Sequence, residues 1–198
     1  MGLLINQIIR KMKQELEDGR LQVGEFKPKV SGCCLAATGK WLCEPEEVEA
    51  KILKGDTAVW EEIQTIQGKY EEEYSGEEVV YSPDFLTRKF QFPQKRLKNV
   101  SNLKADELYN QILYMDVKPL KSGKIAIILK NSSGPAHYIG VTIENEKFIF
   151  FDVNEGFCTM LGYDIFERFI EIYVDDKICG LLRQHYTDFQ VVLFDWDM

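Results

Sequence analysis

The sequence predicts an α+β fold, with helices in the first part of the chain and an antiparallel sheet in the second. Up to about residue 115, apolar residues recur at helical spacing, whereas runs rich in β-branched and aromatic residues follow residue 120. Helical segments grouped ahead of strands are typical of α+β proteins. At 198 residues, we expect one domain spanning 1–198, with a helical half over about 1–115 and a sheet half over about 120–198.

The first predicted helix lies at the N-terminus, where apolar residues recur on one face and cations fall on the other. We interpret it as a terminal helix docked on the core. The apolar run is too short for a signal peptide, and no stretch approaches the ~20 apolar residues of a membrane span. Further helices are predicted over 34–43, 46–53, 56–70 and 104–115. The stretch 21–32 indicates a loop or a short strand, and 71–103 has no clear pattern.

Four strands are predicted in the second half of the chain, over 124–130, 137–144, 147–153 and 189–196. Between the third and the fourth, the segments 163–174 and 177–186 have helical periodicity.

Charge and cysteine content exclude several classes of protein. A net charge of -8 and a pI near 5.0 oppose the binding of nucleic acid, which needs clustered cations. The five cysteines form an odd count without disulfide or zinc-site spacing, so we expect reduced thiols and no metal.

The charged residues are unevenly distributed along the chain. The acidic stretch 44–78 carries twelve acidic residues against three lysines, and the basic stretch 85–105 carries six basic residues and no acidic one. Solvated surface is the simplest interpretation of both. Alternatively, the acidic stretch steers a basic substrate and the basic stretch contacts an anionic membrane surface.

A candidate nucleophile lies in the stretch SGCCLAATGKWL, residues 31–42. Cys34 follows Gly32 at the predicted start of a helix, where unpaired backbone N–H groups favour a thiolate. Trp41 lies two turns further along the same helix face, where it can pack beneath the nucleophile. On this motif alone, Cys33 and Cys34 can equally be small buried hydrophobic residues.

A candidate general base opens the second predicted strand. If Glu144 pairs with Lys147 across a turn at 145–146, His137 and Asp152 lie on the same face of the hairpin. They are then diagonal neighbours, within the ~7–8 Å reach of such pairs. A carboxylate at this distance can hold the imidazole in the orientation that a general base needs. A slip of one residue in the register would separate them.

These residues resemble the signature blocks of the YopT-like cysteine proteases, papain-fold effectors that bacterial pathogens and symbionts deliver into host cells. The blocks are GCCLAATGKW with Cys34, AHYIGVTIE with His137, and FFDVNEG with Asp152. The resemblance spans about residues 32–157, including the 15-residue step from the histidine to the aspartate. It implies a papain-like fold in which Cys34 is the nucleophile, His137 the general base and acid, and Asp152 the group that orients the imidazole.

The resemblance also implies a monomeric virulence effector, secreted into the host cytosol, that cleaves a host protein without a metal or organic cofactor. Papain-like enzymes place a Gln or Asn side chain five or six residues before the nucleophile to bind the oxyanion, but here those positions hold Lys29 and Pro28. Gln22 is a candidate for that role.

Two other functions stay open. Transglutaminases and deamidases share the order Cys, His, Asp along the chain. The missing oxyanion side chain also suits a non-catalytic interaction module on a protease scaffold.

Overall fold

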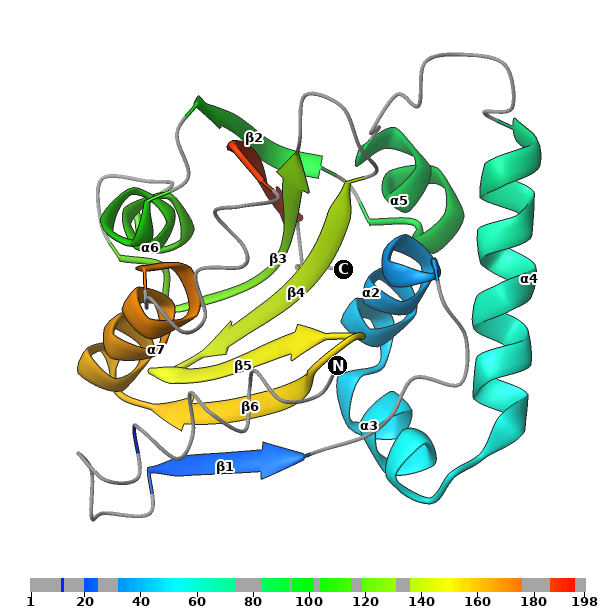
Figure 1. The fold of residues 1–198 in the computed structure, drawn as a ribbon, viewed down its shortest axis with the longest axis horizontal. Helices are drawn as coiled ribbons and strands as arrows, with labels where there is room; N and C mark the ends of the chain where they lie inside the picture. The colour runs from blue at the N-terminus through cyan, green and yellow to red at the C-terminus, as the bar shows by residue number, and fades with distance from the viewer. Residues whose placement is uncertain are drawn as a thin grey trace.

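The computed structural model describes residues 12, 20–24, 32–73, 83–92, 94–101, 104–114, 119–130, 136–175 and 186–194 (Figure 1). Within these ranges a seven-stranded sheet lies between two groups of helices. The strands are β1 (Leu21–Gly24), β2 (Gln94–Ser101), β3 (Ser122–Lys130), β4 (His137–Glu144), β5 (Lys147–Asp152), β6 (Gly156–Leu161) and β7 (Asp188–Phe194). The helices are α2 (Cys34–Cys43), α3 (Pro45–Leu53), α4 (Thr57–Glu73), α5 (Pro83–Phe90), α6 (Ala105–Leu113) and α7 (Tyr163–Asp175).

The sheet has the strand order β1-β6-β5-β4-β3-β7-β2, and all neighbouring strands are antiparallel. The four strands predicted from the sequence are β3, β4, β5 and β7, with ends within two residues of those expected. The sequence did not reveal β6. Both edge strands, β1 and β2, come from the first half of the chain, so the sheet draws on both halves.

The predicted helices correspond to α2, α3, α4, α6 and α7. Asp56 caps the start of α4, because its Oδ1 atom accepts a hydrogen bond from the backbone N–H of Ala58 at 2.9 Å. The helix α5 lies in the stretch 71–103, which has no clear pattern in the sequence. The helix predicted over 177–186 and most of the N-terminal helix lie outside the described residues. No helix in the described part of the chain is long and apolar enough to cross a membrane.

The hydrophobic core fills both faces of the sheet. On β3, Ile125, Ile127 and Leu129 pack with α6 and α7, whereas Ala126 and Ile128 pack with α2 to α5. Figure 1 shows the two groups of helices on opposite sides of the sheet. Burial on both faces explains why the central strands are continuous apolar runs rather than alternating ones. It also holds α2 against the face of the sheet that carries Ala126 and Ile128.

Candidate active site

The candidate nucleophile lies where the chain turns into α2. Gly32 takes a φ of +71°, a left-handed conformation that glycine adopts without strain, and a Cβ atom there would have no neighbour within 4 Å. The first backbone hydrogen bond of the helix joins the N–H of Ala37 to the carbonyl of Cys33 at 2.9 Å. The N–H groups of Cys34 and the next two residues therefore have no acceptor within the helix. Cys34 lies at the positive end of the helix dipole.

The two adjacent cysteines differ in exposure. Cys34 is half-buried, whereas Cys33 is only 2% exposed. Burial, and next the neighbouring Cys34 sulfur, raise the pKa of the Cys33 thiol to about 11. Cys33 is thus an inaccessible thiol that stays protonated, and Cys34 is the accessible one.

The hairpin of β4 and β5 has the predicted register. Glu144 pairs with Lys147, and the two turn residues, Asn145 and Glu146, have φ values of +46° and +65°. Positive φ at both central residues is the geometry of a two-residue type I′ turn. With this even-length turn, the side chains of His137 and Asp152 lie on the same face, and the Nε2 atom of the histidine is 2.9 Å from Oδ1 of the aspartate.

The third group of the predicted triad joins this pair from α2. The Cys34 side chain lies close enough to the imidazole of His137 to contribute to its raised pKa, and the Cys34 sulfur lies 3.8 Å from the carbonyl oxygen of Ala136. Since Nε2 faces the carboxylate, Nδ1 is the ring nitrogen that remains for the thiol. The structure therefore brings together Cys34, His137 and Asp152, which lie far apart in the sequence.

The histidine and the aspartate form a buried ion pair. Burial acts to lower the pKa of His137, but the charge of Asp152 and the hydrogen bonds to Asp152 and Cys34 outweigh it and raise the pKa to about 10. Burial acts to raise the pKa of Asp152, and the His137 charge together with three donated hydrogen bonds lowers it below its usual value. The pair is thus held as imidazolium and carboxylate.

Two tyrosines contact this pair, and neither was predicted from the sequence. Tyr173 of α7 donates a hydrogen bond from its hydroxyl to Oδ2 of Asp152 at 2.8 Å. The ring of Tyr186 stacks on that of His137, with centroids 6.3 Å apart and planes inclined by 26°. The one sequence signal for Tyr173 is a polar hydroxyl on the otherwise apolar face of a predicted helix. Nothing in the sequence singles out Tyr186.

Side chains from α4 and β4 hold α2 in place. Near the start of the helix, Oε1 of Gln67 accepts a hydrogen bond from the N–H of Ala36 at 3.3 Å. One turn further, the hydroxyl of Thr38 donates to the carbonyl oxygen of Tyr138 at 3.1 Å. Because Tyr138 follows His137 directly, this bond ties the nucleophile helix to the strand of the candidate base.

Trp41 sets the distance between α2 and the sheet. Its fully buried ring stacks on Phe151, with centroids 5.0 Å apart and planes inclined by 9°, and its Nε1 donates to Oε1 of Glu49 at 2.9 Å. A Cβ atom on Gly140 would lie 2.6 Å from this ring, so only glycine allows this close approach. The tryptophan packs between the nucleophile helix and the hairpin that carries His137 and Asp152.

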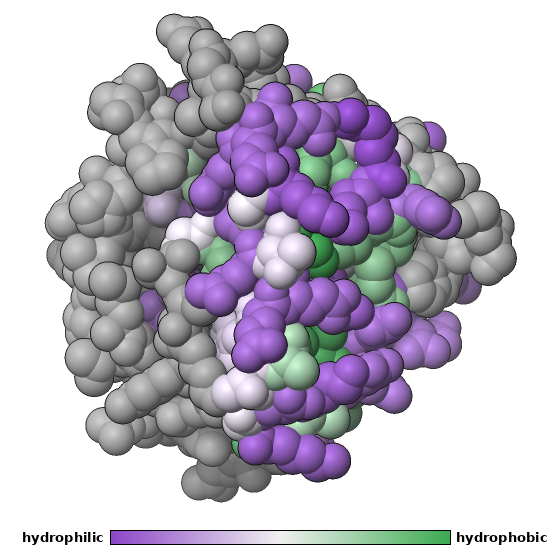
Figure 2. Space-filling model, turned by 90° about the vertical axis from the view of Figure 1, so that its right-hand side faces the viewer, coloured by the Kyte–Doolittle hydropathy of each residue, from purple (hydrophilic) through white to green (hydrophobic). Residues whose placement is uncertain are grey.

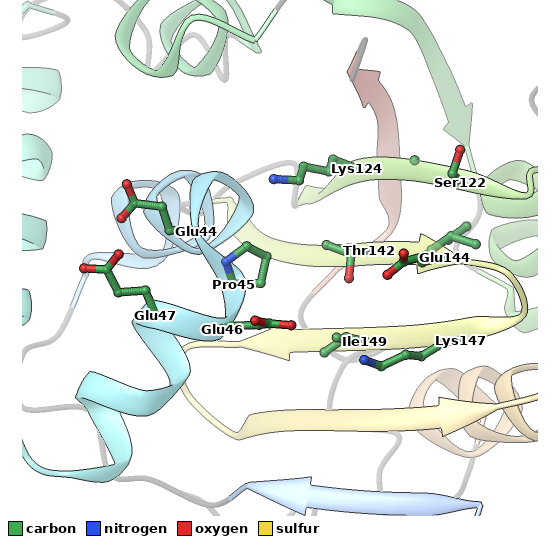
Figure 3. A pocket seen from close by; sticks show the side chains of 12 residues that line it. Glu44, Pro45, Glu46, Glu47, Ser122, Lys124, Thr142, Glu144, Lys147 and Ile149 are labelled. Atoms are coloured by element: carbon green, nitrogen blue, oxygen red, sulfur yellow. The ribbon is translucent and has the colours of Figure 1, made fainter. Parts of the chain in front are cut away.

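At its other end, α2 borders a cavity of about 520 Å³ (Figure 3). Lys124 lies beside this cavity, is 5% exposed and donates hydrogen bonds to the carbonyl oxygens of Leu42 and Cys43, the latter at 3.1 Å. Burial lowers its pKa to about 8. The cavity is lined by Glu144, at the far end of β4 from His137, about 23 Å away at ~3.3 Å per residue. It is therefore separate from the cysteine, histidine and aspartate.

The structure does not support Gln22 as an oxyanion donor. Gln22 lies on the edge strand β1, paired with Thr159, and three strand spacings separate β1 from β4. At ~4.8 Å per spacing this is about 14 Å across the sheet, too far for its amide to reach a carbonyl bound at Cys34. Pro28 and Lys29 lie outside the described residues.

Comparison with known proteins identifies the fold. The crystal structure of the Pseudomonas avirulence protein AvrPphB matches with a TM-score of 0.67 and 15% sequence identity, covering 88% of this chain and 97% of that one. No protein-family model matches the sequence, and no curated protein matches it. The resemblance seen in the sequence is thus confirmed for the fold, because AvrPphB is a YopT-family cysteine protease effector with an α+β papain-like fold.

Proposed function

We propose that this protein is a cysteine peptidase in which Cys34 is the nucleophile, His137 the general base and acid, and Asp152 the group that orients the imidazole. The observation that carries this proposal is the position of His137. Its ring contacts the buried carboxylate of Asp152, and the Cys34 sulfur at the start of α2 lies 3.8 Å from the carbonyl oxygen of Ala136, the residue before the histidine. The similarity to the fold of a cysteine protease effector supports the same function.

The proposed reaction starts from a Cys34 thiolate that lies beside the imidazolium of His137. The thiolate attacks the carbonyl carbon of a peptide bond, and the backbone N–H of Cys34 donates a hydrogen bond to the oxyanion that forms. The imidazolium then gives its proton to the leaving amine, which leaves a thioester on Cys34. Water, deprotonated by the imidazole, hydrolyses the thioester and restores the Cys34 thiolate beside the imidazolium.

A peptide library tests this function. The full chain is incubated with the library, and mass spectrometry measures new peptide termini, with the Cys34→Ala variant as the control. We expect cleavage by the wild type alone. Release of ammonia from glutamine without new termini would instead establish a deamidase or transglutaminase. If Cys34 does not react with a peptidyl vinyl sulfone and no product forms, the protein is a non-catalytic module.

The pH dependence of hydrolysis is expected to reflect the His137–Asp152 pair. The His137 pKa is raised to about 10, so the imidazolium persists through neutral pH and activity falls only in the alkaline range. In Asp152→Asn the carboxylate that raises this pKa is gone while burial, which lowers it, remains. The alkaline limb of kcat/KM should therefore move to lower pH, which a pH–rate profile measures.

The control for this profile is Asp164→Asn, because Asp164 is an exposed carboxylate paired with Arg20 on the surface. Its profile should match the wild type. An unchanged alkaline limb in Asp152→Asn would mean that this carboxylate does not govern the imidazole.

The acidic stretch offers a surface beside the candidate site. Figure 2, which looks onto the side of the molecule that carries α4, shows a largely hydrophilic face. The bond from Gln67 to the start of α2 places this part of α4 near Cys34, and the amide of Gln67 in turn donates to Glu71 at 3.1 Å. Glu71, Glu72 and Glu73 are exposed at the end of α4. We therefore propose that these carboxylates attract a basic segment of a host protein substrate.

Neutralising this end of α4 is expected to slow cleavage of a basic substrate. The triple variant Glu71→Gln, Glu72→Gln and Glu73→Gln should lower kcat/KM at low ionic strength, because long-range attraction raises the association rate. The difference should shrink above about 0.15 M salt, where the Debye length is ~8 Å. A salt series of kcat/KM on one basic peptide measures both effects.

The matched control neutralises Glu46 and Glu47, which are also exposed but lie at the start of α3, beyond the far end of α2. An equal loss in both variants would show a general charge effect and not a surface beside the site.

For the basic stretch 85–105 we propose contact with an anionic membrane, each cation near the surface contributing roughly 1 kcal/mol. Two of its cations, Arg96 and Lys98, lie on the edge strand β2. Co-sedimentation with phosphatidylserine vesicles measures this contact.

The proposed function also includes action in the cytosol of a host cell, as a secreted and monomeric effector.

A further inference from the structure

The carboxylate of Asp152 is held on both of its oxygen atoms. Oδ1 is 2.9 Å from Nε2 of His137 and accepts a hydrogen bond from the backbone N–H of Asn154, also at 2.9 Å. Oδ2 accepts a hydrogen bond from the Tyr173 hydroxyl at 2.8 Å. The first two contacts share one oxygen atom and so hold the carboxylate at Oδ1 only. The third contact holds the other oxygen, so the orientation of the carboxylate plane is fixed at both atoms.

We infer that Tyr173 is a positioning residue of the candidate active site, acting on His137 through the carboxylate of Asp152. This inference rests on the proposed function of the three residues. Tyr173 does not contact the reacting thiol. It sets the angle at which Oδ1 faces the imidazole, and so the direction in which the other ring nitrogen faces Cys34.

The surroundings of Tyr173 fit this role. Its ring is 1% exposed and packs between two phenylalanines, in an edge contact with Phe150 at 4.8 Å and a stacked contact with Phe169 at 5.8 Å. These contacts anchor the ring to β5 and to its own helix, so the hydroxyl has a fixed position. Burial, and next the charge of Asp152, raise the pKa of the phenol well above its usual value. The hydroxyl therefore stays protonated, and donates its hydrogen bond, at neutral pH.

A purely structural role for Tyr173 predicts a different outcome from a positioning role. If the ring only fills space, Tyr173→Phe keeps its packing and changes at most the stability. If the hydroxyl positions the carboxylate, the same variant also changes how Cys34 and His137 react. The removed hydrogen bond lowers the pKa of Asp152 in the wild type, so its loss raises that pKa. As the pH falls, the carboxylate of the variant therefore becomes protonated at a higher pH than in the wild type. Its ion pair with the imidazolium is lost at the same point.

The test is the pH profile of Cys34 alkylation by iodoacetamide in the full chain, followed by mass spectrometry of the peptide that contains Cys34. This readout requires no known substrate. In Tyr173→Phe we expect the acid limb of the profile to move to higher pH. For peptides that the wild type cleaves, we expect kcat to fall about 10-fold with KM unchanged, as for other groups that orient a catalytic side chain through a second residue.

The matched control is Tyr163→Phe, ten residues earlier on the same helix. Tyr163 packs edge-on against Phe148 at 5.4 Å, so the variant makes the same chemical change in a neighbouring ring contact. Its profile should equal that of the wild type. An acid limb unchanged in Tyr173→Phe, or shifted equally in both variants, overturns the inference. If peptides are not cleaved at all but the alkylation profile shifts as expected, the proposed peptidase function fails while the positioning role stands.

Discussion

Replacement of Cys34 by alanine is expected to reduce the rate of peptide hydrolysis by about 10⁴-fold or more while the fold survives. Removing the nucleophile of a catalytic triad removes the covalent route, and what remains comes from binding and oxyanion stabilisation alone. The side chain is small and half-buried, so its loss should leave the circular dichroism spectrum and the melting temperature close to those of the wild type. Initial rates of cleavage of a peptide found in the library measure the effect.

Two further variants make this prediction sharper. Because the three groups act as a unit, the double variant Cys34→Ala, His137→Ala should be no slower than Cys34→Ala alone. Cys33→Ser should retain most of the activity, since this neighbouring thiol is buried and its pKa is raised to about 11. If Cys33→Ser is inactive and Cys34→Ser is active, the two roles must be exchanged.

A single methyl group on Gly140 is expected to impair both stability and activity. In Gly140→Ala the new Cβ atom would lie 2.6 Å from the Trp41 ring, which is held by the stack on Phe151 and the bond to Glu49. Overpacking of this kind typically costs about 1–3 kcal/mol of unfolding free energy. Urea unfolding followed by circular dichroism measures this loss.

The strain at Gly140 should also reach the candidate active site. We expect the clash to push α2 away from β4, and these two elements carry Cys34 and His137. A displacement of ~1 Å between reacting groups can cost about 100-fold in rate. Hydrolysis should therefore fall by more than the loss of folded protein explains.

Gly68→Ala is the matched control for Gly140→Ala. Gly68 lies in α4, and a Cβ atom there would meet nothing within 4 Å. Alanine is favoured over glycine inside a helix by about 1 kcal/mol, so this variant should be at least as stable as the wild type and fully active. Equal stability and activity of Gly140→Ala and the wild type would show that the spacing between α2 and β4 is not set at this contact.

The parts of the fold that could be predicted from the sequence are those fixed by local rules. The helix α2 begins after a glycine in a left-handed conformation, and the hairpin of β4 and β5 follows from a two-residue turn whose length sets the register. That register was sufficient to place His137 and Asp152 on one face. These local features account for the predicted proximity of His137 and Asp152, whereas the choice of Cys34 also depended on the family resemblance.

Elements without a local hydrophobic pattern could not be predicted. The strand β2 has the sequence QKRLKNVS, in which Leu97 and Val100 are the only apolar residues. It lies at an edge of the sheet, where charged residues discourage further pairing, so the alternation that marks a strand is missing. The strand β6 is short and rich in small or flexible side chains, and its position depends on pairing with both β5 and β1.

The contacts of the candidate site that depend on how α7 and β7 pack against the sheet could not be predicted from the sequence either. Tyr173 reaches Asp152 because α7 packs across the sheet with that face inward, and the rotation of a docked helix is set by the whole interface. Tyr186 meets His137 because it precedes β7, which pairs with β3, the neighbour of the strand that carries His137. Such contacts cannot be predicted from residue spacing or composition, because they depend on how the elements pack in the folded chain.

The division of the candidate triad between a hairpin and a distant helix determines when the site forms during folding. His137 and Asp152 are 15 residues apart, so a local hairpin brings them together. Such a hairpin forms in about 1–10 μs. Cys34 meets this hairpin across more than a hundred residues of chain, and contacts of such high sequence separation form late because a large loop must close first. During synthesis the thiol leaves the ribosome long before its base, so the nascent chain carries an inert cysteine until the last strands of the sheet are in place.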